Sequence, residues 1–141
     1  MYIGLDLGTS GVRALLVDED GAPVDAQEAH YQAAHPAPGW SEQDPATWVA
    51  GCQTALAALR AAHPAEYAAV RGVAVAGHMH GAVLLDDAGD VLRPCILWND
   101  TRSHAEAAAL DGADAVRDIS GNIVFPGFTA PKLGRSQVFD M

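Results

Sequence analysis

The first thirty residues alternate between apolar runs and short polar turns. Residues 2–7 (YIGLDL) and 12–17 (VRALLV) are apolar enough for strands, and the turn from Gly8 to Gly11 separates them, where glycine permits a positive φ. A second turn, 18–21 (DEDG), precedes a third and more polar run at 23–31. Strand-length runs joined by such turns predict a β-meander.

The next segment changes to helical spacing. Asp44 stands before a proline, which predicts a helix start, because its carboxylate caps free N–H groups and proline has none to leave unpaired. Trp48, Leu56 and Leu59 fall on one face of a helix over 45–63, and a second proline ends it.

The remaining chain mixes short apolar runs and loops. Residues 72–76 (GVAVA) predict a buried strand, since they are small and β-branched. A loop, a strand, a turn and the start of another strand are expected within 77–91. A short strand is expected at 94–98 (PCILW), and a helix through 104–110 (HAEAAAL). A meander, a helix, a strand and a further helix predict an α/β fold with mixed strand directions.

Composition narrows the class of protein. The 141 residues suffice for one domain; half are hydrophobic, and the net charge is −10. Eight scattered basic residues argue against nucleic-acid binding, and no apolar run approaches the roughly 20 residues that span a bilayer. Cys52 and Cys95 are in no metal spacing and are expected as reduced thiols. With no targeting segment at the start, a cytoplasmic location is expected.

The stretch LDLGTSG at residues 5–11 carries the first candidate chemistry. It is not a Walker A loop, because no Gly-Lys-Ser/Thr follows the glycines. It is not a dinucleotide-binding fingerprint either, because the glycines are followed by an expected strand where that motif requires a helix. Backbone N–H groups of the turn and the hydroxyls of Thr9 and Ser10 suit phosphate oxygens, with added charge from Arg13. Asp6 would repel a phosphate unless Mg²⁺ lay between them. An ordinary hairpin capped by Asp6 is the alternative.

Two later segments carry polar groups at the ends of expected strands. In AGHMHGAVLLD, two histidines one residue apart suggest either a zinc pair, joined by His104 or Cys95, or polar groups at a ligand-binding strand end. In LRPCILWND, a tryptophan followed by an amide and a carboxylate suits a sugar, whose carbon face packs on the aromatic ring while its hydroxyls bind the polar groups. The alternatives are structural histidines, a core tryptophan and an ordinary helix cap.

Five segments in this order resemble one family: LDLGTSGVR, PGWSEQDPATW, AGHMHGAVLLD, LRPCILWND and SGNIVFPGFTAPKL. They are similar to the N-terminal part of the FGGY carbohydrate kinases, which belong to the actin/Hsp70/hexokinase superfamily. The MHG and WND segments narrow the resemblance to the pentulose kinases, and the five segments together look like the N-terminal part of a xylulose kinase. The resemblance implies an actin-like ATPase (ribonuclease H-like) fold. It also implies a partial N-terminal kinase domain over residues 1–133 and a divergent or truncated tail over residues 134–141.

The resemblance implies transfer of the γ-phosphoryl group of ATP to the 5-hydroxyl of D-xylulose. Asp6 then matches the catalytic acid that holds Mg²⁺ through water, and Lys132 is a further basic candidate near the site. The residues that match the ATP phosphate loop are Gly8, Thr9, Ser10, Gly11 and Arg13. The residues that match the sugar contacts are Met79, His80, Trp98, Asn99 and Asp100.

The sequence also departs from the family. The catalytic aspartate of a downstream Gly-Asp-Asn-type motif and the second actin-like domain have no counterpart, and the resemblance is lost at GRSQVFDM. We therefore expect an N-terminal portion with little kinase turnover by itself, whether a fragment, a frameshift or a misjoined gene model. The resemblance allows a homodimer of the full-length enzyme. A non-catalytic sugar- or nucleotide-binding remnant, another pentulose kinase and a small acidic interaction domain are the alternatives.

Overall fold

The computed structural model describes residues 1–136, which form two compact units. The first unit contains residues 1–33 and 44–78, and the second contains 34–43 together with the described residues from 79 onward. No helix in the described part of the chain is long and apolar enough to cross a membrane. Most of the expected divergent tail, residues 137–141, lies outside the described residues.

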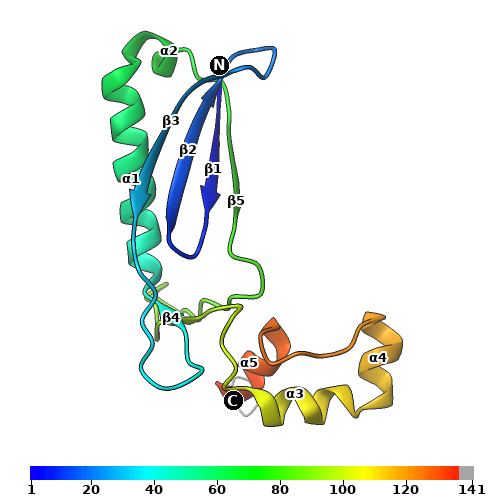
Figure 1. The fold of residues 1–141 in the computed structure, drawn as a ribbon. Coiled ribbons are helices and arrows are strands. Elements are labelled where there is room, and N and C mark those ends of the chain that lie inside the picture. Colours follow the sequence, from blue (N-terminus) through cyan, green and yellow to red (C-terminus); the bar gives the residue numbers. More distant parts are fainter. Residues whose placement is uncertain (137–141) are drawn as a thin grey trace. The chain divides into compact units, whose positions relative to one another are not determined.

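The first unit is built on a four-stranded sheet with the order β3-β2-β1-β5 (Figure 1). Its elements are β1 (Tyr2–Leu7), β2 (Gly11–Val17), β3 (Pro23–His30), α1 (Pro45–Ala62), α2 (Pro64–Ala68) and β5 (Val73–Gly77). The first three strands form an antiparallel meander, and β5 pairs in parallel with β1. The predicted meander and mixed strand directions are confirmed.

Helix α1 covers one face of this sheet, as Figure 1 shows. It begins as expected, with the Asp44 carboxylate accepting a hydrogen bond from the N–H of Ala46 at 2.9 Å. Leu59 is fully buried against strand residues that include Leu16. Burying a side chain of this size stabilises a fold by about 2 kcal/mol, so this packing holds the helix on the sheet.

The strand predicted at 72–76 forms as β5, but the prediction that it is buried is wrong. Val73 is 57% exposed and Val75 65% exposed. The helix explains the difference, because α1 packs on β2 and β3, whereas β5 lies at the opposite edge of the sheet. Small β-branched residues favour a strand here without a layer to cover it.

The second unit has little regular sheet and three helices in its described part. Its elements are β4 (Glu42–Gln43), β6 (Cys95–Ile96), α3 (His104–Asp111), α4 (Asp114–Ser120) and α5 (Thr129–Arg135). β4 and β6 pair antiparallel, which confirms the short strand expected at 94–98. The strand expected within 77–91 and the start of another one there do not form, because only isolated bridges such as Leu85 to Val91 occur between β5 and β6.

Candidate functional site

The turn between β1 and β2 is held by hydrogen bonds to its backbone. The N–H of Gly8 donates to the carbonyl of Gly11 at 2.8 Å, which closes the turn. The Tyr31 hydroxyl donates to the Gly8 carbonyl at 2.9 Å, and the Tyr31 N–H donates to the Ser10 carbonyl at 3.1 Å. Tyr31, the residue after β3, therefore fixes the turn, a role that its place in the sequence did not indicate.

Neither Gly8 nor Gly11 has a positive φ, so a left-handed backbone does not explain the glycines of this turn. A Cβ at Gly11 would lie 2.6 Å from the carbonyl oxygen of Ala29, closer than real Cβ contacts come. The expectation that these glycines supply positive φ is therefore wrong. Gly11 is needed because the backbone of β3, which pairs with β2 at this point, lies too close to leave room for a side chain.

Three charged residues lie side by side on adjacent strands next to the turn. Asp6 on β1 pairs in register with Arg13 on β2, which pairs in turn with Glu28 on β3. Arg13 Nε donates to the Glu28 carboxylate at 2.7 Å. Together with Gly8, Ser10 and Gly11 these residues line a cavity of about 160 Å³, whereas Thr9 of the same turn is not part of its lining. The carboxylate predicted to hold a metal and the turn predicted to hold phosphates thus share one small hollow.

His78, just after β5, also contacts the turn. Its ring stacks on Trp48, with the ring centroids 4.6 Å apart, and it is hydrogen-bonded to the backbone of Gly8. Burial lowers the pKa of His78, which outweighs the opposing effect of the Gly8 hydrogen bond. The neutral ring therefore braces the turn from the β5 side.

In the second unit, all five predicted sugar residues line one cavity of about 380 Å³. Its wall also contains Thr101, His104, Phe125, Pro126, Gly127 and Phe128. Trp98 is 53% exposed, so the alternative of a core tryptophan is wrong. Aromatic and Met side chains beside an amide and imidazoles give this hollow the lining expected of a small polyol site.

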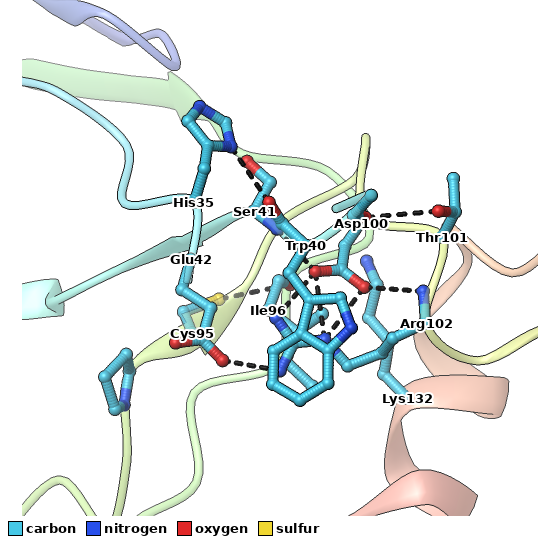
Figure 2. A network of polar contacts seen from close by, with 12 residues as sticks. His35, Trp40, Ser41, Glu42, Cys95, Ile96, Asp100, Thr101, Arg102 and Lys132 are labelled. Atoms are coloured by element: carbon cyan, nitrogen blue, oxygen red, sulfur yellow. Dashed lines mark hydrogen bonds and ion pairs between the residues drawn. The ribbon is translucent and has the colours of Figure 1, made fainter. Parts of the chain in front are cut away.

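Asp100 belongs to the same wall but points into a buried network (Figure 2). Its carboxylate accepts hydrogen bonds from the N–H of Ser41 at 2.6 Å and from Arg102 Nη2 at 2.7 Å. Arg102 also donates to Glu42 at 2.5 Å and lies over the ring of Trp40. Burial alone would raise the pKa of Asp100, but the bonds from Arg102 and Ser41 hold it below its usual range. Asp100 thus holds the cavity wall in place through bonds to Ser41 and Arg102 on the side away from the cavity.

Lys132 is almost completely buried beside this wall, at 1% exposure. Its Nζ donates to the carbonyl of His80 at 2.7 Å and to the carbonyl of Gly127 at 2.6 Å. Burial lowers its pKa to about 8, although Cys95 and Asp100 nearby oppose that shift. The resemblance suggested a basic residue near the site. In the structure, the Lys132 amine lies behind the cavity wall, bonded to the backbone of two lining residues.

The zinc alternative finds no support among residues 1–136, where no group of three or more His, Cys, Asp or Glu side chains is arranged to hold a metal. The His78 ring stacks on Trp48, and the His80 ring stacks on Phe128. Cys95 is buried, and its thiol donates to the carbonyl of Ile96. A single carboxylate such as Asp6 can still serve Mg²⁺, which keeps most of its water.

Several residues of the second unit were missed as contributors to the cavity. Arg102, Gly127 and Phe128 hold or line its wall, yet no role was assigned to them from the sequence. The available signal was the FPGF run inside the last matching segment, where aromatic residues surround a glycine. A Cβ at Gly127 would lie 2.1 Å from the Trp98 carbonyl oxygen, so this glycine allows two wall segments to touch.

Comparison with known proteins identifies the family. Residues 1–134 match the model of the N-terminal domain of the FGGY family of carbohydrate kinases, and the chain therefore belongs to this family. It is 50% identical over 134 residues to a xylulose kinase of Klebsiella pneumoniae, covering 94% of this chain and 27% of that protein.

Solved structures give the same result. A "xyloylose kinase" from Brucella ovis matches with a TM-score of 0.95 at 60% identity, over 99% of this chain and 29% of that one. A xylulose kinase from Rhodospirillum rubrum matches with a TM-score of 0.89 at 34% identity, over 97% of this chain and 29% of that one. The actin-like ATPase fold predicted from the sequence is confirmed. The chain spans about a quarter of the length of the curated relatives that it matches.

Proposed function

We propose that this chain supplies the sugar pocket and the phosphate loop of an ATP-dependent D-xylulose kinase. Membership of the FGGY carbohydrate kinases supports the reaction class. The xylulose kinase relatives at 50% and 34% identity support the choice of sugar. The observation that carries the proposal is the cavity in the second unit, because five residues predicted from two separate segments line one hollow of sufficient size.

The proposed sugar contacts follow from the chemistry of the lining. The carbon chain of the ketose packs on Trp98 and Met79, which are 53% and 69% exposed. The hydroxyl groups bind the side chains of Asn99 and His80, which provide both donors and acceptors. The buried carboxylate of Asp100 keeps its bonds to Arg102 and fixes the backbone of the wall.

The proposed nucleotide contacts lie in the first unit. Backbone N–H groups and hydroxyls of the Gly8–Gly11 turn bind phosphate oxygens, and Asp6 holds Mg²⁺ through coordinated water. The metal, when bound, neutralises the charge of the phosphates. Arg13 reaches the phosphates only by exchanging its bond to Glu28 for them, which is feasible since the Arg13 side chain is 61% exposed.

Phosphoryl transfer needs positioning, charge neutralisation and a base for the attacking hydroxyl. The described residues provide candidates for the first two requirements, and no Gly-Asp-Asn-type motif occurs in the sequence to provide the base. We therefore expect that the 141-residue chain alone binds sugar but shows no robust ADP release with D-xylulose and Mg-ATP in a coupled assay. A robust rate would contradict this.

The test of the sugar site is an NMR titration of the isotope-labelled chain with D-xylulose, run in parallel with L-xylulose and D-ribulose. We expect saturable shifts at the Met79 methyl and the Trp98 indole, largest for D-xylulose. Trp98→Leu should weaken binding at least tenfold, while Ile119→Ala, at a residue that is 88% exposed and outside the cavity, should not. No shift at any cavity residue at millimolar sugar would refute the sugar assignment.

The nucleotide site is tested separately with Mg-ADP. We expect amide shifts at Gly8 and Ser10 that depend on Mg²⁺ and that are lost in Asp6→Asn. Shifts that survive in Asp6→Asn would refute the metal assignment. Sugar shifts without nucleotide shifts would favour a sugar-binding module over a kinase.

A further inference from the structure

The buried ammonium of Lys132 lies where the segments of the cavity wall meet. Helix α5 carries it, and Figure 2 shows the side chain extending from that helix toward the network around Asp100. Its Nζ donates to carbonyls of two wall residues, His80 at 2.7 Å and Gly127 at 2.6 Å. Gly127 in turn packs against the backbone of Trp98. One amine therefore connects the segment of His80 to the segment that touches Trp98.

The backbone at His80 needs such a support. Its φ is 63°, and it has the only non-glycine positive φ among residues 1–136. This left-handed conformation is unfavourable for a residue with a Cβ and persists only where surrounding contacts hold it. The bond from Lys132 to the His80 carbonyl is such a contact, and the stacking of the His80 ring on Phe128 at 4.7 Å is a second.

An alternative is that Lys132 serves only to stabilise the fold. A buried ammonium is a poor choice for that purpose, because its desolvation opposes folding and an apolar side chain would fill the space without that cost. The two bonds it makes go to backbone carbonyls in the cavity wall and not to a carboxylate partner. Bonds to these two carbonyls fit a residue that fixes the backbone conformation of the cavity wall.

We propose that Lys132 is a positioning residue for sugar recognition, which clamps the carbonyls of His80 and Gly127 and so holds the His80 imidazole against Phe128, facing the cavity. This inference rests on the proposed sugar pocket. Lys132 itself makes no contact with the sugar. It acts by keeping His80 in the one conformation that presents its ring beside Trp98 and Asn99.

The experiment compares Lys132→Met with the wild-type chain by two measurements. The first is the NMR shift of the His80 ring protons, which the stacked Phe128 ring displaces upfield. The second is the dissociation constant of D-xylulose from the titration above. We expect the His80 ring shifts to collapse toward those of Phe128→Leu, and sugar affinity to fall at least tenfold. Methyl signals of Leu5 and Leu16 in the first unit report whether the rest of the chain stays folded.

Two further variants make the result specific. Arg135→Met removes a cation from the same helix at a side chain that is 50% exposed, and should change neither measurement. Lys132→Gln keeps two N–H donors on a side chain one bond shorter, and should restore part of the His80 ring shift. Lys132→Met with normal ring shifts and affinity within twofold of wild type would overturn the proposal. Unfolding of the second unit in both Lys132 variants would overturn it as well, since it would assign the residue to stability.

Failure of the proposed function is recognised separately. If the wild-type chain does not bind D-xylulose, the sugar assignment is lost. The His80 ring shifts still decide whether Lys132 positions that residue.

Discussion

The two candidate sites place their ion pairs in opposite environments. In the first unit, the side chains of Arg13 and Glu28 are 61% and 40% exposed beside the turn. In the second unit, the side chains of Arg102 and Asp100 are 3% and 1% exposed behind the cavity wall. An exposed pair exchanges partners at little cost, whereas breaking a buried pair leaves a charge without solvent. The first arrangement suits a loop that must accept a charged ligand, and the second suits a rigid wall for a neutral one.

The largest expected effect is the loss of the buried pair. Asp100→Ala leaves the Arg102 guanidinium buried with only Glu42 and the Trp40 ring, and should lower the free energy of unfolding by about 3 kcal/mol or more. Glu28→Ala, the matched truncation of the exposed pair in the first unit, should cost at most about 1 kcal/mol. Urea denaturation followed by Trp fluorescence measures both. Equal costs would show that exposure does not separate the two pairs.

The second expected effect concerns the turn, which is held by close backbone approach and not by charge. Gly11→Ala places a methyl group 2.6 Å from the Ala29 carbonyl and should destabilise the first unit by about 1–3 kcal/mol. It should also weaken Mg-ADP binding by distorting the turn. Gly4→Ala is the control, because nothing lies within 4 Å of a Cβ there. Nucleotide affinity unchanged in Gly11→Ala would show that the turn does not need its native shape.

The sequence predicted local structure well where the signal was itself local. The cap at Asp44, the meander and the short strand at 94–98 depend on neighbouring residues, and all three are confirmed. The exposure of Val75 was not predictable, because it depends on which strands α1 covers. The strand expected within 77–91 failed for a related reason. Its apolar residues lie in an irregular segment with few pairing partners.

In the candidate sites, too, the sequence predicted what depends on neighbouring residues and not what depends on distant segments. Motif spacing indicated the residues of the turn and of the sugar cavity. The structure brings all five sugar residues to one hollow, and all the turn residues except Thr9 to another. The roles of individual side chains there remain predictions. What the sequence could not show is the direction in which a side chain points. Asp100 turns inward to Arg102, and Lys132 lies under the wall, because bonds to segments far away in the chain orient them.

The smallest expected effect is a difference between the two units in the pH at which each begins to lose stability. The pKa of His78 lies below its ordinary value of 6.5, so the unfolded chain binds its proton more readily than the folded chain, and stability should fall as the pH drops below about 6.5. The pKa of Asp100 lies below 3.8, so its contribution is lost only as the pH falls below that value.

We therefore expect the turn of the first unit to weaken at a higher pH than the wall of the second. Amide hydrogen exchange at Gly8 and at Arg102 between pH 7 and pH 4 measures this. The comparison is corrected for the intrinsic pH dependence of exchange. His78→Gln should remove the early loss of protection at Gly8 and leave Arg102 unchanged. Parallel loss of protection at both sites in the wild-type chain would show that His78 does not set the acid limit of the turn.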